Sequence, residues 1–129
     1  MNHGRTQVGT VRTHRDVRGA VFEPVGAADI AAARNVHVVL TEPGCIRGNH
    51  RHVVGTEITV IVGPAEVRLK EDGIIHDIAV PAGETWRFTI PPGVTHAFRN
   101  PGPGPMLLVA FNSELHDADQ PDAVREEIL

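Results

Sequence analysis

The stretch PGCIRGNHRHVVGTE at residues 43–57 decides how this chain is interpreted. It places His50 and His52 two residues apart, and Glu57 follows five residues later. Alternate side chains of an extended strand point to the same face, so the two imidazoles are expected to project together. Either they line a site or they lie on a solvated surface.

Outside this stretch, short apolar runs alternate with turns rich in glycine and proline. The 129 residues include 13 glycines and 10 prolines, and 41% of the chain is hydrophobic, which is normal for one globular domain. In the run 65–70, Ala65, Val67 and Leu69 alternate with charged residues, a pattern typical of a strand with one buried face. Besides the histidine segment, strands are predicted at 20–25, 36–41, 57–62, 65–70, 74–80, 85–90, 94–100 and 106–112.

About nine short strands without long helices between them indicate an all-β sandwich or barrel of antiparallel strands. The length predicts a single domain over residues 1–129. An alanine-rich run at 26–34 predicts either one helical turn or a loop. The tail is predicted to hold one short C-terminal helix, with Asp119 as its cap and Pro121 in its first turn.

A third histidine, His96, follows the rigid turn Pro91-Pro92-Gly93, and Glu57 begins a strand expected to run back beside the histidine strand. Three imidazoles and one carboxylate converging from two hairpins suit a divalent transition metal and leave positions open for water or substrate. The predicted metal ligands are therefore His50, His52, Glu57 and His96.

The joint spacing of these residues resembles the cupin superfamily, whose motifs are G-x5-HxH-x3,4-E-x6-G and G-x5-PxG-x2-H-x3-N. The matching residues lie within 44–100: Gly44, His50, His52, Glu57 and Gly63 for the first motif, and Gly83, Pro91, Gly93, His96 and Asn100 for the second. The Glu57–Gly63 interval is one residue short and the Gly83–Pro91 interval two residues long, and neither departure touches a ligand position. The resemblance implies a cupin jelly-roll barrel.

The runs DVRGAVFE (16–23) and RGNHRH (47–52) look like stretches of cupin-fold nucleotide-sugar epimerases and ketoisomerases. Together with IPPGVTHAFRNPG (90–102) and the tail 111–129, they are most similar to the C-terminal cupin domain of the UDP-acetamido-sugar reductases. That resemblance implies epimerisation of a 4-keto sugar nucleotide at C3, and one divalent ion, zinc favoured, with iron, manganese or nickel as alternatives. The dehydrogenase domain that precedes the cupin in those proteins is not in this sequence, so a reductase activity is not carried over.

Epimerisation beside a ketone removes an α-proton, and a neutral imidazole with a pKa near 6.5 is suited to be the base. If three histidines bind metal, His37 and His76 are the candidate catalytic residues, as a free base or a further nitrogen ligand; both also fit histidines of the core or rim. The resemblance implies that Arg18 and Arg47 contact the substrate's pyrophosphate. Arg18 fits a surface turn equally well.

The same RGxH stretch is similar to the rhamnose-type 3,5-epimerases, which use no metal and pair a histidine base with a tyrosine acid. This chain has no tyrosine and keeps Glu57, so the metal-bound interpretation is favoured. Two other classes of function stay open: a metal-dependent cyclase or dioxygenase acting on an apolar, polyketide-like molecule, and a non-catalytic small-ligand binder. A basic pocket built from Arg18, Arg47 and Arg99 would favour a phosphate-bearing substrate, and a sealed apolar interior an apolar one.

The net charge of −4 without a basic block argues against nucleic acid as the main partner. No apolar stretch is long enough for a membrane span or a signal peptide, and the single Cys45 rules out an internal disulfide, so a cytoplasmic location without membrane contact is expected. The family resemblance implies a homodimer, with residues 12–23 as the segment exchanged between subunits.

Overall fold

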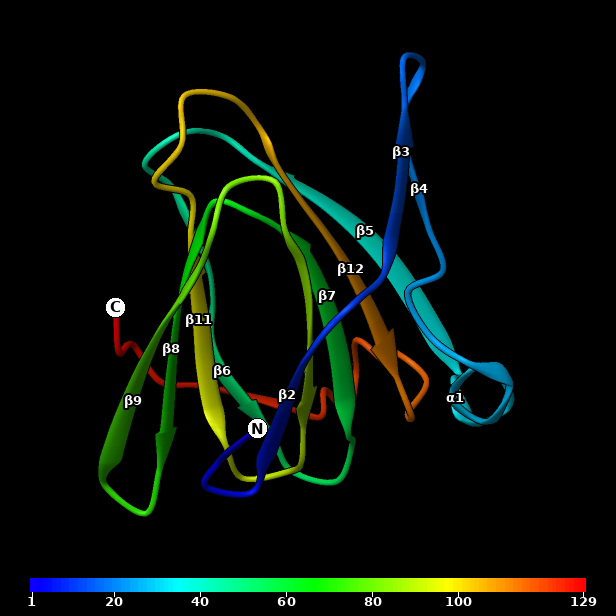
Figure 1. Cartoon of the computed structure of the whole chain (residues 1–129). Helices are drawn as coiled ribbons and strands as arrows, with labels where there is room; N and C mark the ends of the chain where they lie inside the picture. Colours follow the sequence, from blue (N-terminus) through cyan, green and yellow to red (C-terminus); the bar gives the residue numbers. More distant parts are fainter.

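The fold consists of two antiparallel sheets that face each other, and the computed structural model describes residues 1–129 (Figure 1). The six-stranded sheet contains, in spatial order, β1 (Asn2–His3), β2 (Thr6–Thr10), β10 (Thr85–Ile90), β7 (Glu57–Val62), β12 (Met106–Asn112) and β5 (Asn35–Thr41). The five-stranded sheet contains β13 (Ala123–Arg125), β6 (Ile46–His52), β11 (Thr95–Arg99), β8 (Ala65–Glu71) and β9 (Ile74–Val80). A separate hairpin of β3 (Thr13–Asp16) and β4 (Gly19–Phe22) projects from the barrel, and helix α1 (Ala27–Ala32) follows it.

Local sequence chemistry sets most of the strand boundaries. The predicted bounds of β7, β9, β10 and β12 agree with the structure. Between β8 and β9 the chain reverses at Asp72 and Gly73, whose φ angles of 50° and 76° are those that an Asp-Gly hairpin turn requires. The all-β cupin architecture is therefore confirmed, and the run 26–34 contains the short helix α1. No helix in the chain has the length and apolarity needed to span a membrane.

Two predictions about the ends of the chain were wrong. The strand expected at 20–25 ends at Phe22, since Pro24 has no N–H to donate to a strand ladder. The C-terminal helix does not form; residues 123–125 are strand β13, paired with β6. The extended tail reaches the five-stranded sheet. There the carbonyl of Ile128 accepts a hydrogen bond from Arg68, and its N–H donates one to Asn49. The carboxylate of Glu126 binds Lys70.

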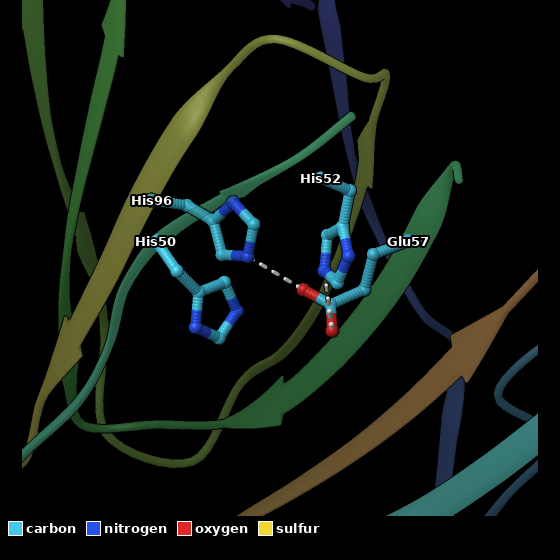
Figure 2. Close-up of side chains that lie close together, drawn as sticks. All are labelled: His50, His52, Glu57 and His96. Atoms are coloured by element: carbon cyan, nitrogen blue, oxygen red, sulfur yellow. Dashed lines mark ion pairs between the residues drawn. The ribbon is translucent and has the colours of Figure 1, made fainter. Parts of the chain in front are cut away.

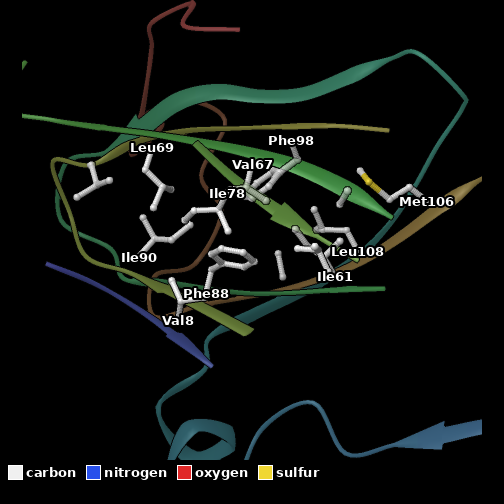
Figure 3. Packing of buried hydrophobic residues seen from close by; sticks show 14 residues of the cluster. Val8, Ile61, Val67, Leu69, Ile78, Phe88, Ile90, Phe98, Met106 and Leu108 are labelled. Atoms are coloured by element: carbon white, nitrogen blue, oxygen red, sulfur yellow. The ribbon is translucent and has the colours of Figure 1, made fainter. Parts of the chain in front are cut away.

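A core of fourteen buried apolar residues fills the space between the sheets (Figure 3). Ala65, Val67 and Leu69 form the buried face of β8, as their alternation predicts. Phe88 and Ile61 from the facing sheet are completely buried against this layer. The interior is thus packed with side chains and is not a sealed apolar hollow that could take an apolar ligand.

Candidate metal centre

The four predicted ligands meet at one end of the barrel (Figure 2). His50 and His52 lie near the end of β6, Glu57 is the first residue of β7, and His96 is the second residue of β11. One donor atom from each side chain lies within 4.8 Å of all the others. Residues 46 positions apart in the chain therefore form a compact N3O cluster between the two sheets.

A bulge in the pairing of β6 with β11 fixes the relative positions of the histidines. His50 pairs with His96, and the register shifts between His96 and Ala97. Gly48, opposite Ala97, has a φ of 90°, and a Cβ atom at this position would lie 2.6 Å from the carbonyl oxygen of His96. Only glycine allows the two backbones to approach this closely, and the approach leaves the His50 and His96 rings with centroids 4.8 Å apart.

The atoms that point to the centre of the cluster lack hydrogen-bond partners. His96 Nε2 lies 2.8 Å from Glu57 Oε2, and His52 Nε2 lies 3.8 Å from Glu57 Oε1. Both Nε2 atoms are buried, and neither has hydrogen-bonding geometry to any partner. Buried nitrogens of this kind need a partner, and a cation between them and the carboxylate would supply it. The donor set therefore fits a divalent metal ion.

The backbone fixes which nitrogen of His96 carries its proton. Nδ1 lies 3.0 Å from the carbonyl oxygen of Val94, and a carbonyl can only accept, so Nδ1–H is the donor. Nε2 then presents a lone pair to the cluster, as metal-binding histidines require.

The charges of the cluster also suit a cation. Burial by itself would raise the pKa of the Glu57 carboxyl, but contacts with His52 and His96 hold it well below its usual range, so the carboxylate is ionised. The Glu57 carboxylate raises the pKa of His52. Burial, reinforced by neighbouring His96, lowers the pKa of His50 to about 4. The result is an ionised carboxylate beside a neutral imidazole, the protonation state that metal ligation needs.

A cavity of about 450 Å³ opens beside the cluster. Two of its 14 lining residues are hydrophobic, and none is lysine or arginine. His37 on β5 lines this cavity, so the structure brings one of the two candidate catalytic histidines to the site. The lining residues are Asn35, His37, His50, His52, Gly55, Glu57, Asn112, Glu114, Leu115, His116, Asp117, Pro121, Asp122 and Ala123.

The structure does not bring the other predicted site residues to this cavity. His76 lies on edge strand β9 against His3, with ring centroids 5.7 Å apart. Arg18 is at the tip of the projecting hairpin, paired with Asp16 and almost fully exposed. Arg47 is exposed on β6 and does not line the cavity. The proposed basic pocket is absent as well.

Arg99, the third arginine expected in that pocket, pairs with Glu66 at 3.0 Å instead. The reason is geometric: strand alternation and the position of the hairpin direct these arginines away from the cluster of histidines and Glu57.

Sequence reasoning missed the contribution of the C-terminal residues. Seven lining residues, among them His116 and Asp122, follow the last strand of the six-stranded sheet. They lie about 60 residues from the histidine motif in an acidic tail with no strand alternation, so no local pattern identified them.

Facing antiparallel sheets with a three-histidine, one-glutamate cluster at their strand ends define this protein as a cupin. Within that class, the chain belongs to the polysaccharide biosynthesis C-terminal domain family, whose model matches residues 14–124.

A related protein is the UDP-2-acetamido-2,6-beta-L-arabino-hexul-4-ose reductase of Pseudomonas aeruginosa, 29% identical over 115 residues. The match covers 87% of this chain and 30% of the reductase. Among solved structures, the capsular polysaccharide assembling protein CapF of Staphylococcus aureus is 26% identical, with a TM-score of 0.69. That likeness covers 92% of this chain and 34% of CapF. The chain therefore spans about a third of the length of both relatives.

Two smaller solved proteins share the fold over most of their length. The sugar 3,4-ketoisomerase QdtA of Thermoanaerobacterium thermosaccharolyticum, in complex with TDP, is 20% identical with a TM-score of 0.73, covering 94% of this chain and 88% of QdtA. A dTDP sugar isomerase from Desulfovibrio desulfuricans G20 is 16% identical with a TM-score of 0.81. The likeness covers 95% of this chain and 84% of the isomerase. At these identities the comparison shows the fold alone.

Proposed function

We propose that this domain binds one divalent metal ion, zinc favoured, through His50, His52, Glu57 and His96, and isomerises or epimerises a keto sugar nucleotide. The observation that carries the metal site is the pair of buried, unpartnered Nε2 atoms facing an ionised carboxylate. The family match, the UDP-sugar reductase and the capsular polysaccharide assembling protein CapF support the choice of substrate class.

The lining of the cavity favours a hydroxyl-rich substrate. Asn35 and Asn112 at the ends of β5 and β12, with Asp117, offer amide and carboxylate groups that can bind sugar hydroxyls. Because two of the 14 lining residues are hydrophobic and the barrel interior is packed, a polar sugar fits this site better than the apolar substrate of a cyclase or dioxygenase.

Two imidazoles are available for proton transfer. A bound divalent cation supplies positive charge beside an oxyanion that develops at the keto group. His37 and His116 line the same cavity but are not among the four clustered residues. We assign His37 as the base that removes the proton next to the ketone and returns it, with His116 as a second proton carrier.

An exposed apolar strip supports the proposal that the protein is a homodimer. Val36, Val38 and Leu40 lie on the outer face of edge strand β5 and are 54%, 63% and 60% exposed. An apolar strip on an unpaired edge is a surface that association would cover. Light scattering after gel filtration tests this: a dimer is expected for the wild type and a monomer for Val38→Glu, whereas a monomeric wild type would refute it.

The activity is tested with zinc-loaded protein and 4-keto sugars linked to UDP or dTDP, incubated in D2O. Proton NMR should show deuterium entering the position next to the ketone. His37→Ala should abolish exchange while keeping bound zinc, and His14→Ala on the projecting hairpin should behave like the wild type. Absence of exchange with every sugar in the zinc-loaded wild type would contradict the proposed reaction.

A further inference from the structure

The C-terminal segment 121–129 lies directly against the strand that carries two of the clustered histidines. Strand β13 pairs with β6 so that Ala123 is opposite His52 and Arg125 opposite His50. Asn49, the residue before His50, binds the end of the tail: its Oδ1 accepts the N–H of Ile128 at 2.9 Å. The tail therefore belongs to the framework around the metal cluster.

Asp122, at the start of this pairing, is held rigidly by backbone groups. Its Oδ1 accepts the N–H of Val54 at 2.8 Å, and its Oδ2 accepts the N–H of Gly55 at 2.9 Å. Its own carbonyl accepts the N–H of Val53 at 3.0 Å. Two consecutive backbone donors thus fix the carboxylate, and a third fixes its backbone, beside the end of β6.

The fixed carboxylate faces the outer nitrogen of His52. Asp122 Oδ2 lies 3.5 Å from His52 Nδ1, while His52 Nε2 points into the cluster toward Glu57. A negative charge at Nδ1 favours the tautomer with its proton on that atom, so Nε2 offers a lone pair. The Val94 carbonyl lies behind the His96 ring in a similar way, at 3.0 Å from Nδ1, so His52 and His96 each have an acceptor behind the ring.

We propose that Asp122 is a positioning residue that orients His52 for metal binding. The inference rests on the metal site of the proposed function. It also assigns a role to the C-terminal segment, which carries this carboxylate to a site whose four clustered residues all lie between positions 50 and 96.

The test compares the zinc dissociation constants of Asp122→Asn and Glu114→Gln, measured by competition with a chromophoric chelator. Glu114 is a matched control, because it is an exposed carboxylate on the same cavity wall and forms no ion pair with a clustered histidine. Loss of a carboxylate behind a metal-binding histidine typically weakens metal affinity about 10- to 100-fold. We expect such a loss in Asp122→Asn and a change below about twofold in Glu114→Gln; equal weakening of both would overturn the proposal, since it would reflect loss of negative charge alone.

A purely structural role for Asp122, in holding residues 53–55, predicts a different outcome. It predicts a lower melting temperature of the metal-free protein, with zinc affinity unchanged. The visible spectrum of the Co²⁺-loaded protein adds an independent readout, since a reoriented His52 alters the ligand field. If Asp122→Asn does not fold, Asp122→Ser retains an acceptor for one backbone N–H and replaces it in both measurements.

The outcomes also separate this inference from the proposed function. If either Asp122 variant binds zinc with wild-type affinity and keeps the wild-type Co²⁺ spectrum, the role of Asp122 is overturned and the metal site stands. A wild-type protein that binds no zinc and no Co²⁺ would overturn both.

Discussion

Replacing Gly48 by alanine should damage the fold and the metal site together. The glycine lies in the bulge where β6 passes β11, with a φ of 90°. A Cβ atom there would meet the carbonyl oxygen of His96 at 2.6 Å and the Cα of Ala97 at 3.2 Å. Both neighbours are backbone atoms, so the clash is relieved only if the two strands move apart.

The size of the effect follows from two contributions. Holding a side chain at this positive φ costs about 1–2 kcal/mol. Separating two packed strands adds about 1–3 kcal/mol, the usual cost of overpacking. We therefore expect Gly48→Ala to lower the free energy of unfolding by about 2–5 kcal/mol. Zinc affinity should fall at least tenfold, roughly the cost of losing ligand orientation, because His50 and His96 lie on the separating strands.

Two glycines provide matched controls for this substitution. Gly44 has a φ of 79° and no atom lies within 4 Å of the place a Cβ would occupy, so Gly44→Ala measures the backbone contribution alone. Gly9 also has open space and no positive φ, so Gly9→Ala should be close to neutral. Urea unfolding of the metal-free proteins and chelator competition give the two quantities. If Gly48→Ala costs no more than Gly44→Ala and retains its zinc affinity, the account of the bulge is refuted.

Other expectations concern the metal and its ligands. His52→Ala should remove bound metal, measured by elemental analysis, and leave a folded β-protein by circular dichroism; His116→Ala should keep its metal, and full occupancy in His52→Ala would refute the ligand assignment. Chelation should lower the melting temperature of the wild type, since a ligand at 100 times its dissociation constant stabilises by about 2.7 kcal/mol, and an unchanged melting temperature would contradict a bound ion. The lowered pKa of His50, about 4 in place of 6.5, means that the unfolded chain takes up a proton first as the pH falls. The free energy of unfolding of the metal-free protein should therefore fall by about 1 kcal/mol between pH 7 and 5, after allowance for solvent screening. Urea titrations at each pH should show a smaller loss of unfolding free energy in His50→Gln. The same dependence of the unfolding free energy on pH in that variant would contradict the role of His50.

The sequence predicts those parts of the fold that local chemistry decides. Turns rich in glycine and proline bound β7, β9, β10 and β12 as predicted, and burial alternates along β12. The convergence of His50, His52, Glu57 and His96 was predictable for the same reason, since each of these residues occupies a fixed place in a strand or beside a rigid turn. The predicted helix at the C-terminus failed because β13 forms through pairing with β6, about 70 residues earlier, and its three residues are all exposed.

The site residues taken from the family resemblance had no such local support. Arg18 and Arg47 were expected at the pyrophosphate, yet a single chain holds neither at the cavity. Asp122 shows the opposite case: nothing in DADQPDAVREEIL distinguishes its carboxylate from its acidic neighbours. Its position becomes apparent only when the backbone N–H groups of residues 53–55 are seen to hold it.

The charge of the cavity bears on how a sugar nucleotide would be bound. Glu57, Glu114, Asp117 and Asp122 line the cavity, and no lysine or arginine does. A divalent ion offsets two of these charges, which suits the uncharged sugar ring but leaves the two negative charges of a diphosphate unopposed. The diphosphate must then lie outside this cavity and meet cations that a single chain does not place there. In the proposed homodimer, the exposed Arg18 on the projecting hairpin would supply such a charge if the hairpin reached the cavity of the neighbouring copy, so the proposed homodimer and the proposed substrate depend on each other.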